Sequence, residues 1–206
     1  RLAAHQFPTV ISDSVAELLT AVGEETGLDF DPGSPDIDGT LAKLGTIANI
    51  IGATFRDTAN PTMLKAGYKA NVIPQTAEAV FDCRVLPGRQ AEFERTVDQL
   101  IGPDVTREWI TKLDSYETTF DGHLVDAMNE AILAHDPEAR TVPYMLSGGT
   151  DAKAFAKLGI RCFGFAPLQL PPELDFSALF HGVDERVPVD ALLFGTRVLE
   201  HFLLNS

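Results

Sequence analysis

The sequence predicts a mixed α/β fold in two parts: an α+β domain of the ferredoxin-like type over residues 1–113, and an α/β segment over residues 114–206. Two observations predict this division. Apolar and polar residues alternate over residues 62–70 and 77–85, between segments that have helical periodicity. After residue 114, amphipathic helices alternate with short apolar strands, which is typical of a parallel sheet layer.

Two helices are predicted before the first strand. Ser14-Val15-Ala16-Glu17 has the form of a capping box, apolar residues follow at helical spacing, and Gly27 ends the pattern. A second amphipathic helix is predicted where Leu41, Leu44, Ala48 and Ile51 recur at the same spacing.

Residues 62–70 and 77–85 are predicted to be half-buried strands joined through Asn71-Val72-Ile73-Pro74. A turn at Leu86-Pro87-Gly88 then leads into a helix, and residues 105–113 read as a further strand. This order matches a βαββαβ unit without its first strand, and the open edge would expose unpaired backbone groups. We therefore expect the missing strand to precede Arg1 in a longer protein.

The second part contains three predicted helices and two predicted strands. A helix is expected around residues 124–132, a strand over 142–146, a helix over 151–158 ended by Gly159, and a strand over 160–166. The last helix is expected to begin at Pro188, since proline is favoured at the first position of a helix.

The composition disfavours several classes of function. The 206 residues include 30 Asp and Glu against 16 Lys and Arg, a net charge of −14 that repels nucleic acid and anionic lipid. No run of eighteen apolar residues is present for a membrane span. The two cysteines, Cys83 and Cys162, cannot form a disulfide framework or a Cys-rich zinc site, so we expect buried thiols and a reducing, cytoplasmic compartment.

Two segments of the second part carry candidate functional residues. Ser147-Gly148-Gly149-Thr150 joins a predicted strand to a predicted helix, where backbone amides can face an anion; the alternative is a tight turn capped by Thr150 or Asp151. His181 ends an apolar run beside Gly182 and two carboxylates. It can ligate a metal through one nitrogen, and the alternative is a structural histidine.

The predicted hairpin carries a second candidate set, Asn71, Asp82 and Arg84. Arg84 presents a planar fork that suits a carboxylate, and Asn71 in a turn can offer an amide donor. The alternative is a surface ion pair between Asp82 and Arg84 or a lysine, which contributes little to stability.

Taken in order, these motifs resemble the M20 family of zinc-dependent peptidases and aminoacylases. The resemblance covers most of the chain from residue 40 onward. It rests on Ala59-Asn60-Pro61-Thr62, Gly67-Tyr68-Lys69-Ala70-Asn71-Val72-Ile73-Pro74, Asp82-Cys83-Arg84-Val85-Leu86-Pro87-Gly88, Ser147-Gly148-Gly149-Thr150-Asp151 and His181-Gly182-Val183-Asp184-Glu185.

The resemblance implies an α/β catalytic domain interrupted by a ferredoxin-like lid that pairs two subunits into a homodimer. It also implies two zinc ions, and a substrate that is a peptide or N-acyl amino acid cleaved next to a free carboxylate. His181 matches a zinc ligand, and Asn71 and Arg84 match lid residues that hold the carboxylate or the oxyanion. Ser147, Gly148, Gly149 and Thr150 match the loop that lines the carboxylate site, and Asp82 would orient Arg84.

The family's other metal ligands and its general base lie in motifs upstream of the lid, which this sequence does not contain. A single histidine cannot hold two zinc ions, because even one catalytic zinc normally has three protein ligands. We therefore expect no catalytic residue in this chain, no tight zinc binding and no hydrolysis by the chain alone. The alternative is a non-catalytic dimerisation or binding module built from the same fold.

Overall fold

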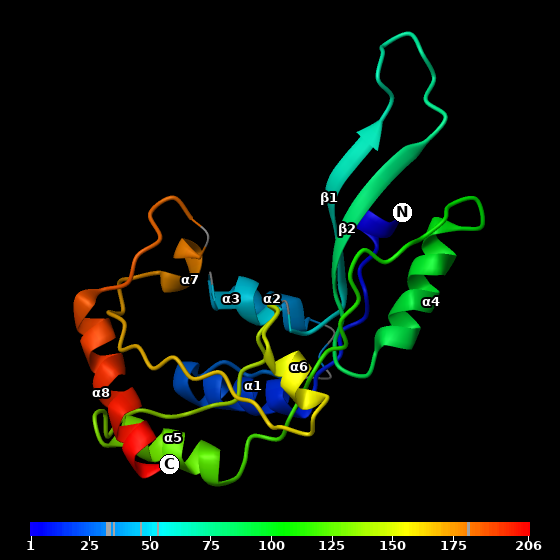
Figure 1. The fold of residues 1–206 in the computed structure, drawn as a ribbon. Coiled ribbons are helices and arrows are strands. Elements are labelled where there is room, and N and C mark those ends of the chain that lie inside the picture. The colour runs from blue at the N-terminus through cyan, green and yellow to red at the C-terminus, as the bar shows by residue number, and fades with distance from the viewer. Residues whose placement is uncertain (32–33, 35, 46, 53, 181) are drawn as a thin grey trace.

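The computed structural model spans residues 1–206 and describes all of them except 32, 33, 35, 46, 53 and 181 (Figure 1). It is a mixed helix and strand fold with a small antiparallel sheet, which confirms the predicted class at that level. The described elements are η1 (Leu2–Ala4), α1 (Asp13–Thr26), α2 (Ile37–Ala42), α3 (Ile47–Gly52), β1 (Thr58–Ala66), β2 (Ala77–Arg84), α4 (Gln90–Ile101), α5 (His123–Leu133), α6 (Ala152–Ala156), α7 (Phe176–Leu179) and α8 (Val189–Asn205).

Strands β1 and β2 form a hairpin that projects away from the helices (Figure 1). Their register runs from Thr58 opposite Arg84 at the root to Ala66 opposite Ala77 at the far end. β1 lies four residues earlier than predicted. It accommodates Pro61 at an irregularity in the register, where a residue without an N–H is tolerated. It ends before Gly67, whose φ of 72° turns the chain out of the strand.

Helix α4 forms after the turn at Leu86-Pro87-Gly88, as predicted, and it packs against the root of the hairpin. Phe93 is buried and stacks on Phe7 with their ring centroids 5.0 Å apart. Val97 joins the same cluster, against which Ala59 of β1 and Cys83 of β2 pack. The hairpin root and α4 therefore share one apolar core.

The strand predicted over residues 105–113 is wrong, because in the described part of the chain β1 and β2 pair only with each other. This segment instead follows α4 and is held to it by ion pairs. Arg107 contacts Asp98 at 2.8 Å and Glu94 at 3.7 Å, and Lys112 contacts Glu94 at 2.6 Å. Side-chain contacts with a helix thus replace the backbone ladder that a strand would need.

Helices α1, α2 and α3 form a second core with the residues that follow them, centred on Val15, Leu19 and Phe55. Helix α1 ends at Gly27 as predicted, with φ of 71°, but it begins after Ser12 rather than at the predicted capping box. The single helix predicted around residues 41–51 is divided into α2 and α3, with Gly45 in the left-handed region between them.

The strands predicted over residues 142–146 and 160–166 are also wrong, since the structure assigns no strand to these described segments. Val142 and Met145 pack their side chains against the α1–α3 core instead. This packing joins residues from both predicted parts of the chain, and the boundary near residue 114 remains a prediction.

Helices α5 and α8 lie side by side and enclose a third apolar cluster (Figure 1). Ala131 and Val198 are fully buried there beside Phe194. Gly195 lets α8 approach the preceding chain, since a Cβ at this position would lie 2.3 Å from the carbonyl oxygen of Pro167. None of the described helices is long and apolar enough to cross a membrane.

Candidate carboxylate-binding site

Arg84 lies at the end of β2, at the root of the hairpin. Its Nε donates to Asp82 Oδ1 at 2.6 Å and its Nη2 donates to Asp82 Oδ2 at 3.0 Å. The two residues are two apart on one strand, so their side chains leave the same face of the sheet. A bidentate pair of this kind holds the guanidinium plane in one orientation.

The third contact of Arg84 crosses to the second part of the chain. Its Nη1 donates to the backbone carbonyl of Ser147 at 3.1 Å, across 63 residues of sequence. Contacts with described residues use three of the five guanidinium N–H groups, and the side chain is 46% exposed. Two donors therefore remain for a ligand beside the Ser147 turn.

Ser147-Gly148-Gly149-Thr150 forms a bend that precedes the short helix α6. The φ angles of Gly148 and Gly149 lie outside the left-handed region, so neither is needed for backbone freedom. A Cβ at Gly149 would meet open space among the described atoms. Asp151 precedes α6, yet its side chain makes no capping hydrogen bond to a described residue. The alternative interpretation of a turn capped by Asp151 is therefore not supported.

Within one chain, Asn71 lies far from Arg84 and its partners Asp82 and Ser147. It is exposed in the turn that connects β1 to β2, beyond the pair Ala66 and Ala77, whereas Arg84 is at the opposite end. Seven residues of strand separate Arg84 from Ala77, a length of roughly 24 Å. The structure therefore brings Arg84 and Ser147 together and leaves Asn71 at the tip of the hairpin.

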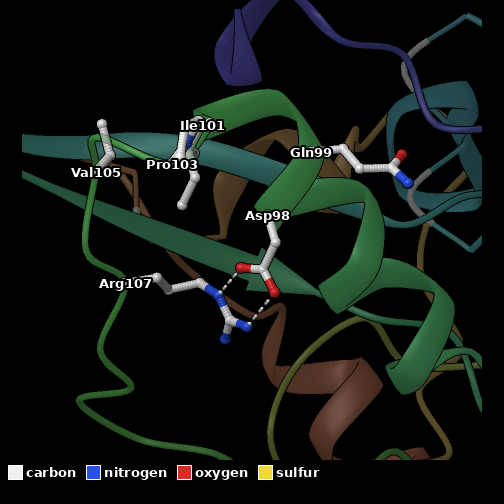
Figure 2. Close-up of a pocket in the computed structure, with 7 residues that line it drawn as sticks. Asp98, Gln99, Ile101, Pro103, Val105 and Arg107 are labelled. Carbon is white, nitrogen blue, oxygen red and sulfur yellow. Dashed lines mark hydrogen bonds and ion pairs between the residues drawn. The ribbon is translucent and has the colours of Figure 1, made fainter.

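A pocket of about 570 Å³ lies elsewhere, at the end of α4 (Figure 2). Asp98 and Arg107 form one of its walls through two hydrogen bonds of 2.8 and 3.0 Å, and Ile101, Pro103 and Val105 supply apolar surface. The predicted site residues lie outside its lining. The candidate site is thus defined by the donors of Arg84 rather than by this cavity.

Residues 12–205 match the model of peptidase family M20/M25/M40. The chain belongs to this family. It is 30% identical over 165 residues to N-fatty-acyl-amino acid synthase/hydrolase PM20D1 of Mus musculus, covering 76% of this chain and 32% of that protein. The probable carboxypeptidase S-like 2 of Dictyostelium discoideum is 29% identical over 145 residues, with shares of 68% and 27%.

Aminoacylase-1 of Sus scrofa is 28% identical over 149 residues, covering 70% of this chain and 35% of that protein. This member of the M20 family therefore spans about a third of the length of the curated relatives it matches. These relatives carry the names of amide-bond hydrolases, as the sequence motifs predict. No solved structure matches the chain significantly.

The metal site implied for the M20 family is not supplied by the described residues. No group of three or more His, Cys, Asp or Glu side chains able to hold a metal ion occurs among them. His181, the predicted zinc ligand, lies outside the described residues. Among the described residues, the candidate site therefore consists of Asp82, Arg84 and Ser147.

Sequence reasoning missed Asp57, which supports the hairpin root. Its buried carboxylate accepts a hydrogen bond from the Leu86 amide at 2.8 Å and another from Arg89 Nε at 3.0 Å. Although burial opposes it, the bonded Asp57 carboxylate holds the pKa of Arg89 above its usual value. The available signal was one acidic residue two positions after Phe55, where an apolar segment ends, but its partners lie 29 and 32 residues away.

Proposed function

We propose that this chain is the carboxylate-binding part of an M20 amidohydrolase. The complete protein would cleave a peptide or N-acyl amino acid bond next to a free carboxylate. The observation that carries this proposal is the arrangement of Arg84, oriented by Asp82, tied to the Ser147 carbonyl and left with two N–H donors. A planar carboxylate accepts two parallel hydrogen bonds from such a fork.

The relatives support the substrate class. One is named as an N-fatty-acyl-amino acid synthase/hydrolase and another as an aminoacylase, and both names describe chemistry on an acylated amino acid. Such a substrate carries a free carboxylate one carbon from the amide nitrogen. An arginine that holds the carboxylate would therefore fix the position of the amide.

We assign the remaining machinery to the part of the protein outside this sequence. The general base and most zinc ligands would lie there, with His181 contributing one ligand by its match to the family motif. The chain alone would then bind zinc weakly and be inactive. Asn71, Gly148, Gly149 and Thr150 are proposed as further contacts of the substrate carboxylate or oxyanion.

The hairpin tip supports a homodimer. Leu64, Tyr68 and Ile73 are 81%, 86% and 94% exposed, an apolar surface that the single chain leaves uncovered by described residues. We propose that a second copy of the chain covers this tip. Asn71 lies in the same turn, so it would reach a site in the partner copy rather than Arg84 of its own chain.

The proposed compartment is the reducing cytoplasm. Cys83 and Cys162 are free and half-buried rather than fully buried as expected. Burial raises the pKa of the Cys83 thiol, with a smaller contribution from the neighbouring Asp82 carboxylate, which keeps it protonated and unreactive.

The decisive experiment is Arg84→Ala in the complete protein, assayed on an N-acyl amino acid and on the matching amide that lacks the carboxylate. Loss of a charged hydrogen-bond pair is expected to reduce kcat/KM for the acid by about 10- to 100-fold. The amide should be almost unaffected. Arg95→Ala is the matched control, because Arg95 is an exposed arginine on α4.

Equal losses on both substrates, or unchanged activity on the acid, would remove Arg84 from carboxylate recognition. A complete protein without hydrolase activity, whose hairpin still drives association, would favour the non-catalytic dimerisation module.

A further inference from the structure

Two histidines that the M20 resemblance does not use come together where α5 and α8 meet. His135 follows the end of α5 and is exposed, whereas His201 lies in the last turns of α8 and is half-buried. Their ring centroids are 5.8 Å apart and the ring planes are inclined by 84°. The two helices lie side by side (Figure 1) and are held together by the apolar cluster around Ala131 and Val198.

This separation suits chelation of one metal ion. Imidazole nitrogens bind Zn²⁺ at about 2.1 Å, so an ion shared at the tetrahedral angle holds the two ring centroids roughly 5.3 Å apart. The observed 5.8 Å exceeds this value by about 0.5 Å, a difference that a small rotation of the two side chains would close. Imidazole is a preferred ligand of Zn²⁺, Ni²⁺ and Cu²⁺, whereas Mg²⁺ prefers oxygen ligands.

The surroundings leave the ring nitrogens available. Within the described part of the chain, neither imidazole takes part in a hydrogen bond or an ion pair. The backbone at His135 is fixed, since its amide donates to the Ile132 carbonyl at 2.9 Å. The net charge of −14 also raises the local concentration of cations around the protein.

We propose that His135 and His201 form a two-histidine site for a divalent transition-metal ion, which bridges α5 and α8. Water would complete the coordination shell. The site uses none of the residues of the candidate carboxylate-binding site, and it serves to fasten α8, the last helix of the described chain, to α5. It stands whether or not the proposed hydrolase activity is correct.

The test is thermal unfolding of the 206-residue chain with about 1 mM ZnCl₂, NiCl₂ or MgCl₂. A ligand that binds only the folded state raises Tm, and at about a hundred times its Kd the rise for a chain of this size is about 5 °C or more. We expect this rise with Zn²⁺ and Ni²⁺ but not with Mg²⁺. Calorimetric titration should give one site per chain.

The informative variants are His135→Phe and His201→Phe, because phenylalanine keeps an aromatic ring at each position and removes the ligand. Each should abolish the metal-dependent rise while the metal-free chain keeps its helical circular dichroism. His5→Phe is the matched control, since the His5 ring packs against Phe7 at 4.7 Å rather than against a second imidazole. It should retain the full rise.

An unchanged metal response in both His135→Phe and His201→Phe would overturn the proposal, as would a wild-type chain that responds to none of the three salts. Should either phenylalanine variant lose its helical signal, His135→Gln and His201→Gln replace it, and the calorimetric site must again disappear.

Discussion

At the scale of single residues, a buried carboxylate holds the hairpin root to the start of α4. Asp57 is 1% exposed and bonds both the Leu86 amide and Arg89. Arg89 also contacts Glu92 at 3.0 Å, but that carboxylate is 52% exposed. The Arg89 guanidinium thus binds one buried carboxylate, Asp57, and one solvated carboxylate, Glu92, so the contributions of the two ion pairs to stability can be compared directly.

We expect Asp57→Ala to lower the free energy of unfolding by about 3–5 kcal/mol, because it leaves the Leu86 amide and a largely buried guanidinium without their acceptor. Glu92→Ala is the control and should cost less than about 1 kcal/mol, as exposed ion pairs do. Urea unfolding followed by circular dichroism measures both. Similar small losses in the two variants would mean that Asp57 does not support the root.

The candidate carboxylate-binding site of Asp82, Arg84 and Ser147 could be predicted only in part from the sequence. The pairing of Asp82 with Arg84 follows from strand periodicity, which places residues two apart on one face. The contact from Arg84 to Ser147 spans 63 residues, and residue types alone do not predict it. The family resemblance assigns Arg84 to the substrate carboxylate or the oxyanion, and Ser147 to the loop that lines the carboxylate site, but it does not predict this contact.

At the scale of elements, residues 105–113 show that a strand cannot be predicted without knowing the neighbouring strand with which it would pair. The helices α1, α4 and α8 were predicted correctly because the apolar periodicity of a helix can be read within a single segment of the sequence. A strand needs a neighbour for its backbone groups. Arg107 and Lys112 instead form ion pairs with carboxylates of α4. The alternation of apolar and polar residues along residues 105–113 carries no information about such tertiary contacts.

Acid should release this segment from α4. Hydrogen bonds from Lys112 and Gln90 lower the pKa of Glu94, and one from Arg107 lowers the pKa of Asp98. Because both native pKa values lie below those of the unfolded chain, the stabilisation is complete above the unfolded values near about pH 4. It is lost as the pH falls through the native values.

Trp109, the single tryptophan, reports this release. Trp109 is 37% exposed and the Arg107 guanidinium lies 4.9 Å from its ring centroid, so detachment exposes the indole further and shifts its emission to longer wavelength. We expect Glu94→Gln to show part of this shift already at neutral pH, and Glu108→Gln, at an exposed position, to behave as wild type. Emission that stays constant on acidification until the helical signal is lost would contradict local release.

At the scale of the whole molecule, the proposed dimer makes a quantitative prediction. Leu64→Asp and Ile73→Asp place charges on the exposed hairpin tip and should halve the mass measured by light scattering at micromolar concentration. Ile110→Asp is the control, since Ile110 is 82% exposed but lies on the segment beside α4. A wild-type chain with the mass of one copy would exclude association through this surface.

The hairpin extends from its root, where Arg84 lies opposite Thr58, so any tilt of the two strands has its pivot near Arg84. Its far end lies roughly 24 Å from the pivot, so a tilt of about 10° at the root sweeps the tip through roughly 4 Å. In the proposed dimer, a partner copy that immobilises the tip would restrict the angle at which the Arg84 guanidinium meets the proposed substrate carboxylate. Conversely, a carboxylate bound at Arg84 would narrow the range of positions in which the tip can meet the proposed partner copy.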